Sequence, residues 1–130
     1  MTFVLKLMDS TRTERIDDVE AFVGRDRSGS FGILARHERM MTSLDFGLAR
    51  FRRAGGSWQY LAVPGALVYF HDDELELSTR HYLIDADYKR ISAAVEAELT
   101  AEEAELESTK TSLRRMEEEV MKRLWRLRRD

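Results

Sequence analysis

The chain contains no cysteine among its 130 residues, which excludes disulfide bonds, thiolate nucleophiles and thiolate metal ligands. It also lacks a long apolar segment. The longest run, residues 61–70, is interrupted by Pro64 and Gly65 and is half the length of about twenty residues that a membrane helix needs. With a net charge of −3, the chain has no excess of basic residues with which to bind nucleic acid. We therefore expect no membrane-spanning helix and no nucleic-acid partner.

Glycine and proline are missing from the last half of the chain. All seven glycines and the single proline lie between Gly24 and Gly65, and none follows. Short segments of period two precede residue 84, such as the one with Phe3, Leu5 and Leu7 on one face, and turn residues such as HDDE at 71–74 separate them. They predict a flattened antiparallel β-sandwich or barrel of about ten short strands over residues 1–83, with one strand ending at Gly24. Residues 84–130 form a second, helical domain.

Apolar residues in the helical domain recur at helical spacing from Ile84 onward, with a heptad row at 99, 106, 113, 120 and 127. Thr100 followed by Glu103 matches a capping box, which places the start of a second helix at residue 101. Residues 84–107 carry a charge of −6 and residues 108–129 a charge of +5. Opposite charges favour a two-helix hairpin. The absence of a breaker equally allows one straight helix, so both a closed and an extended state are open.

Catalytic chemistry has little support in the sequence. His37, His71 and His81 are isolated and show no metal-ligand spacing. The carboxylates lie in solvated helical runs, and no glycine-rich loop has the form of a phosphate-binding loop. We predict a non-enzymatic protein with no metal and no cofactor.

The basic C-terminal stretch KRLWRLRRD, residues 122–130, has three possible uses. It fits a membrane surface, a nucleic acid, or an acidic groove on a protein partner. We favour the protein partner because the acidic half of the same helical domain would repel both alternatives.

The stretch GSFGILARHERMMTSLDFG, residues 29–47, resembles the epsilon subunit of F-type ATP synthases. That family has the pattern G-x-x-G-I-L-P-G-H-x-P-h-h-T-x-L-x-P-G, where h is apolar. A second stretch, YLAVPGALVYFHDDELEL at residues 60–77, is similar to the family's Y-x-A-V-S-G-G run and the strand after it. The chain departs from the first pattern at four positions: Ala35, Arg39 and Phe46 replace prolines, and Arg36 replaces the glycine before the histidine.

The resemblance implies a non-catalytic rotor subunit that couples the gamma subunit to the membrane ring of c subunits in proton- or sodium-driven ATP synthesis. It would lie peripherally at the cytoplasmic side of the cell membrane. Its helices could also reach the alpha and beta subunits and inhibit ATP hydrolysis. The resemblance implies that Ser30, Arg36 and His37 contact the ring and that Met40 and Met41 contact gamma. It implies that the tail docks through four basic residues: Arg115, Lys122, Arg123 and Arg126.

Some relatives bind ATP through an I-D-x-x-R-A signature at the base of the helical domain. This chain offers Asp85, Asp87 and Arg90 there, but tyrosine stands where the arginine belongs. We therefore expect no ATP binding. Two other hypotheses remain: a β-sandwich adaptor with a dimerising coiled-coil tail, and a sandwich that binds a small ligand.

Overall fold

The computed structural model describes residues 1–129, with side chains described as far as Leu127. It contains nine strands and one helix. In chain order these are β1 (Phe3–Met8), β2 (Thr13–Asp26), β3 (Gly29–Leu34), β4 (Met40–Leu44), β5 (Gly47–Arg53), β6 (Trp58–Val63), β7 (Ala66–His71), β8 (Glu74–Thr79), β9 (Leu83–Asp85) and α1 (Tyr88–Arg129). The predicted sandwich followed by helix is confirmed.

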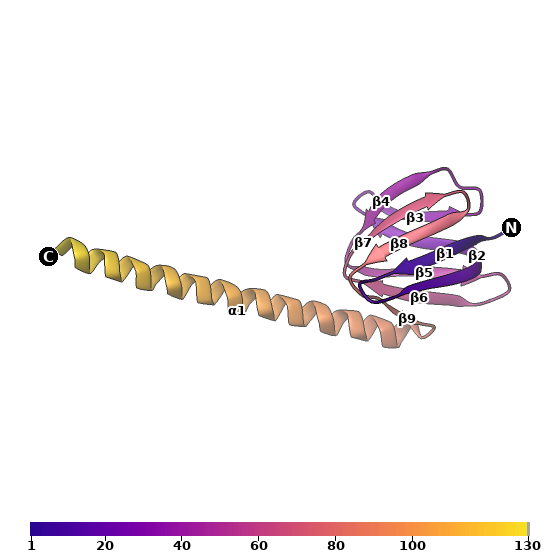
Figure 1. Cartoon of the computed structure of the whole chain (residues 1–130). Helices are drawn as coiled ribbons and strands as arrows, with labels where there is room; N and C mark the ends of the chain where they lie inside the picture. Colours follow the sequence, from indigo (N-terminus) through magenta and orange to yellow (C-terminus); the bar gives the residue numbers. More distant parts are fainter. Residues whose placement is uncertain (130) are drawn as a thin grey trace. The chain divides into compact units, whose positions relative to one another are not determined.

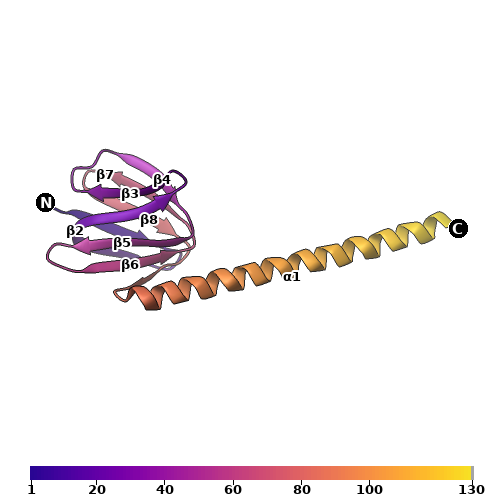
Figure 2. The same cartoon turned by 180° about the vertical axis from the view of Figure 1, so that it is seen from behind.

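The strands form one hydrogen-bonded path, β4-β7-β8-β1-β2-β5-β6-β9, which folds into two layers, with β3 paired to β2. Figure 1 shows β7, β8 and β1 on its near side, and Figure 2 shows β2, β5 and β6 from behind. Every pairing is antiparallel except that of β1 with β8, which is parallel. The predicted antiparallel sandwich therefore has one exception, this parallel pair.

Strand β2 belongs to both layers. Its first half pairs with β1 and its second half with β3 and β5, and the register shifts in the β1 and β5 pairings near its middle. Asp18 lies at this point with a φ of 57°. A bulge of this kind bends a strand and increases its twist, so it carries β2 from one layer to the other.

The core lies between the two layers. In β1 the alternation predicted from the sequence holds, because Phe3, Leu5 and Leu7 are at most 2% exposed. Phe22 and Phe70 are fully buried, and the rings of Phe3 and Phe70 meet edge to face with centroids 5.6 Å apart. Burying each such side chain contributes roughly 1.5–3 kcal/mol to folding.

Gly24 lies inside β2 instead of ending a strand, which corrects the sequence prediction. A Cβ atom built at Gly24 would stand 2.8 Å from Leu44 Cδ2 and 3.0 Å from atoms of Phe22 and Phe31. Glycine is needed there because the side chains of Leu44, Phe22 and Phe31 already fill the space, and not because the chain turns.

The predicted hairpin of two helices was wrong: α1 runs without interruption from Tyr88 to Arg129. Thr100 lies inside the helix, whereas a capping residue must leave helical geometry. No glycine or proline follows Gly65 to break the hydrogen-bond ladder. The helix also begins later than the apolar spacing indicated, because Ile84 belongs to strand β9.

The chain divides into two compact units, Met1–Val95 and a second that begins at Glu96. The first unit includes the sandwich and the opening turns of α1, where Ile91 is only 2% exposed. The start of the helix is therefore part of the first unit's folded core.

Candidate functional site

The loop between β3 and β4 is held in place by Asp73. Arg36 has a φ of 66°, and its backbone N–H donates a 2.6 Å hydrogen bond to Asp73 Oδ1. The N–H of His37 donates to the carbonyl of Leu34 at 3.2 Å, which closes a turn. A non-glycine residue at positive φ is strained, so the bond from Asp73 helps to keep this turn in a single conformation.

His37 and Arg39 lie against aromatic rings of β7. The His37 ring meets Phe70 edge to face at 5.8 Å, and its Nδ1 lies 2.8 Å from the carbonyl oxygen of Glu38. The Arg39 guanidinium lies 6.0 Å from the ring of Tyr69. The loop therefore exposes two arginines, one histidine and one glutamate, Glu38, beside the sandwich.

Ser30 lies away from this loop. It occupies the first half of β3, paired with Arg25, whereas Arg36 and His37 follow the end of the same strand. Ser30 borders a cavity of about 370 Å³ together with Arg50 and Tyr60. The structure thus brings together only two of the three residues that we predicted for ring contact.

The two adjacent methionines point in opposite directions. Met40 packs against the hydrophobic core, and Met41 is 62% exposed. Met41 lies opposite Tyr69 in the β4–β7 register, on the same outer face as Leu67, which is 48% exposed. Of the pair predicted for gamma contact, Met41 is exposed and Met40 is partly buried against the core.

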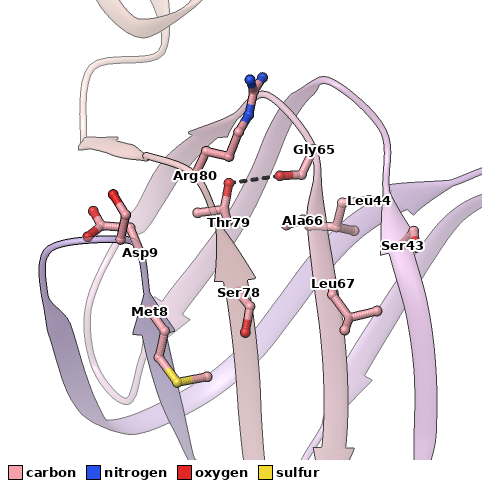
Figure 3. A pocket seen from close by; sticks show the side chains of 11 residues that line it. Met8, Asp9, Ser43, Leu44, Gly65, Ala66, Leu67, Ser78, Thr79 and Arg80 are labelled. Atoms are coloured by element: carbon pink, nitrogen blue, oxygen red, sulfur yellow. Dashed lines mark hydrogen bonds between the residues drawn. The ribbon is translucent and has the colours of Figure 1, made fainter.

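A shallow hollow of about 770 Å³ continues this outer face beside Leu67 (Figure 3). Met8, Leu67 and Ala66 contribute apolar atoms to it, and Arg80 lies at its margin. The Thr79 hydroxyl donates to the Gly65 carbonyl at 2.7 Å, which fixes the turn beneath the hollow. Exposed apolar surface next to a concave region is typical of protein docking sites. We call Met8, Met41 and Leu67 the outer apolar patch.

The three residues considered for ATP binding all have partners within the chain. Arg90 donates to both carboxylate oxygens of Asp85, at 2.6 and 2.8 Å. These bonds, and a further one from the N–H of Asp87, lower the pKa of Asp85 to about 2. Asp87 accepts from the N–H groups of Lys89 and Arg90, which caps the start of α1. In this arrangement the groups stabilise the helix start.

The tail residues lie on an exposed helix surface. Arg115, Lys122 and Arg126 are exposed, and Arg123 is paired loosely with Glu119 at 3.9 Å. The heptad residues of the same helix are also exposed, from 43% at Leu99 to 75% at Leu127. This helix therefore displays an apolar stripe that is bordered by acidic groups up to residue 107 and mainly by basic groups after it.

Two residues of the site were missed from the sequence. Asp73 was recognised only as a turn residue, because its bond to Arg36 joins positions 37 residues apart and leaves no local signal. Leu67 could have been found, since its alternation with buried Ala66 and Val68 places it on the outer face.

The described residues form neither a metal-ligand cluster nor a membrane-spanning helix. Over residues 1–129, no three His, Asp or Glu side chains are grouped so as to hold a metal ion. None of the helical residues described forms a stretch apolar and long enough to cross a bilayer.

The fold and these surfaces define a β-sandwich with a helical tail, carrying an exposed loop and an apolar patch suited to protein contacts. Residues 2–83 match the family described as ATP synthase, Delta/Epsilon chain, beta-sandwich domain. The chain belongs to this family, as the motif resemblance indicated.

Individual relatives agree with the family model. The chain is 25% identical to the ATP synthase epsilon chain of Prochlorococcus marinus over 120 residues, which cover 92% of this chain and 82% of the relative. It is 31% identical to that of Prochloron didemni over 77 residues, covering 59% of this chain and 56% of the relative. The second match thus includes little more than half of the relative's length.

Solved structures share the fold. A chain of the Euglena gracilis mitochondrial ATP synthase, in an OSCP/F1/c-ring structure, has a TM-score of 0.60 and 21% identity, with 74% of this chain and 62% of that chain covered. A chain from the Tetrahymena thermophila mitochondrial ATP synthase central stalk and c-ring has a TM-score of 0.55 and 14% identity, with coverages of 64% and 66%.

Proposed function

We propose that this chain is a non-catalytic central-stalk subunit of a rotary F-type ATP synthase. It connects the gamma subunit to the c-ring during proton- or sodium-driven ATP synthesis and lies peripherally at the cytoplasmic side of the cell membrane. The observation that carries the proposal is the outer apolar patch on a sandwich of the ATP synthase delta/epsilon family. A rotor subunit needs such a surface because it must hold the shaft throughout rotation.

The outer apolar patch is the surface that we assign to gamma. Met41 and Leu67 occupy diagonal positions on neighbouring strands, and side chains in such positions are close enough to form one contact surface. Burying both at an interface removes two large exposed apolar groups from water.

We assign ring contact to the loop that carries Arg36 and His37. Both residues are exposed, and the bond from Asp73 limits the conformations of the loop. Two arginines in this loop favour polar ring loops that expose acidic groups or backbone carbonyls. Ser30 lies elsewhere on β3 and takes part only if the ring surface extends along that strand.

We assign inhibition of ATP hydrolysis to α1. Its basic half, with Arg115, Lys122, Arg123 and Arg126, would dock in an acidic groove formed by the alpha and beta subunits. Truncation after Leu99 should then raise ATP hydrolysis by the assembled complex, with unaltered assembly as the control. Unchanged hydrolysis would contradict a braking role for the tail.

Binding to the purified gamma subunit tests the central assignment. Titration calorimetry should show binding by the full chain, and Met41→Asp with Leu67→Asp should weaken it at least about tenfold, because charge would enter an apolar contact. Leu83→Asp is the matched control, since Leu83 is 55% exposed but lies on β9, outside the patch. Absence of binding to gamma would refute the proposal.

A second experiment tests ring coupling. Arg36→Ala combined with His37→Ala should reduce ion pumping by the assembled complex while gamma binding stays intact. Normal ion pumping in this variant would show that the loop is not part of the ring interface.

A further inference from the structure

The second unit of the chain displays a regular apolar stripe on one helix. Leu99, Leu106, Leu113, Val120 and Leu127 recur every seven residues and are 43%, 58%, 54%, 55% and 75% exposed. We propose that, before assembly, two copies of this chain pair through this stripe as an antiparallel coiled coil. The occupant of the stripe in the free protein is therefore a second copy of α1.

Helix geometry favours a helical partner. An apolar residue every seven positions drifts by about 20° per heptad on a straight helix, so two such helices wind around each other to keep their stripes in contact. The row from Leu99 to Leu127 extends for about 42 Å at 1.5 Å per residue. Met116 and Leu124, which are 64% and 56% exposed, widen the stripe in its C-terminal half.

Charge decides the direction of pairing. Between residues 96 and 107 every charged side chain is acidic, and between residues 108 and 127 six basic groups outnumber three acidic ones. A parallel pair would place acidic half against acidic half. An antiparallel pair places each acidic half beside the partner's basic half, where opposite charges attract.

Individual flanking positions agree with this direction. If the stripe residues are heptad positions a, Glu105 and Arg126 are both g positions, and Lys110 and Glu117 are both e positions. Equivalent flanking positions face one another across an antiparallel pair. Glu105 then meets Arg126 of the second copy, and Lys110 meets its Glu117, each twice by symmetry. A parallel pair would instead bring Glu98 against Glu103 of the other copy.

Sedimentation equilibrium of the full chain over a concentration series tests self-association. The mass should rise from that of the 15.2 kDa monomer to twice that value. Leu113→Asp, at the centre of the stripe, should abolish the rise. Met121→Asp is the matched control: Met121 is 66% exposed on the same helix but lies outside the stripe, so this variant should still dimerise.

A charge exchange tests direction. Glu105→Arg or Arg126→Glu alone should weaken the dimer roughly tenfold, because two attractive pairs become repulsive. The double variant should recover the original affinity, since the pairs are restored in reverse. In a parallel dimer Glu105 would face Lys110 of the other copy, so adding Arg126→Glu could not restore the affinity lost by Glu105→Arg.

Three results would overturn the proposal: a monomer at every concentration, equal effects of Leu113→Asp and Met121→Asp, or no recovery in the double charge variant. None of them bears on gamma binding, which uses the outer apolar patch on the sandwich. The two proposals therefore fail separately.

Discussion

Asp85 and Arg90 join the end of β9 to the first turn of α1 through two charge-assisted hydrogen bonds, 2.6 Å from Nε to Oδ2 and 2.8 Å from Nη2 to Oδ1. A bidentate pair of this kind has a defined geometry as well as a favourable energy. It lowers the pKa of Asp85 to about 2 and raises that of Arg90. The pair fixes where the helix leaves the sheet.

Removing this pair should destabilise the first unit in a pH-dependent way. Since the folded pKa of Asp85 is about 2, below its ordinary value of 3.8, its contribution is complete above about pH 4 and is lost as pH falls through 2. Asp85→Asn should therefore melt at a lower temperature than the parent at pH 7, and the two curves should converge near pH 2. Circular dichroism melts measure this. Arg90→Ala should lower the melting temperature by a similar amount. The double variant should lose no more than either single variant, because both changes break the same pair.

Arg36→Gly should stabilise the protein by about 0.5–1 kcal/mol, because glycine adopts a φ of 66° without the strain that a Cβ introduces. The backbone N–H that donates to Asp73 is kept in this variant. Urea unfolding measures the effect. Arg39→Gly in the same loop is the control and should give no gain, since Arg39 is not at positive φ. A loss of stability in Arg36→Gly would show that the arginine side chain outweighs the strain.

Gly24→Ala should destabilise the sandwich by about 1–3 kcal/mol through overpacking. The added Cβ would lie 2.8 Å from Leu44 Cδ2, closer than such atoms normally approach. Gly32→Ala is the matched control on the neighbouring strand, where the nearest atom to a built Cβ is 3.9 Å away. Denaturant unfolding of the two variants should separate them clearly. Equal free energies of unfolding for the two variants would mean that the core around Gly24 shifts to admit the added methyl group.

Tyr82 should lose its hydroxyl proton at a higher pH than an exposed tyrosine does. Burial raises its pKa to about 12, and its hydroxyl donates a 2.8 Å hydrogen bond to Glu14 Oε2, which adds to the rise. The contribution of this hydroxyl to stability is complete below about pH 10 and is lost as pH rises through 12. Ultraviolet titration of phenolate should show a late step that Tyr82→Phe removes. An unchanged titration curve in that variant would contradict the assignment.

Local patterns in the sequence predicted much of the sandwich. Alternation placed Phe3, Leu5 and Leu7 on the buried face of β1, and the HDDE stretch was recognised as a turn. That turn has both central residues, Asp72 and Asp73, at positive φ, as a two-residue hairpin requires. Such features depend on neighbours in sequence, so they can be inferred without the fold.

The candidate site was predicted less completely. The sequence indicated the loop with Arg36 and His37, but not that Asp73 holds it or that Met40 turns inward while Met41 turns outward. Those facts depend on which strands pair and which layer each strand joins. Strand pairing links distant positions, and period two alone does not say which of two faces is the inner one.

The sequence alone determined the change from strands to helix, the family and the heptad stripe, because each follows from short-range periodicity or from motif order. Only the tertiary structure decided that Gly24 is needed for packing, that Ser30 lies apart from His37, and that α1 continues through Thr100. The physical reason for the first two is that close packing and strand partners depend on atoms that the chain brings together from far apart. At Thr100 the sequence allowed both a cap and a continuous helix, and only the backbone geometry distinguishes them.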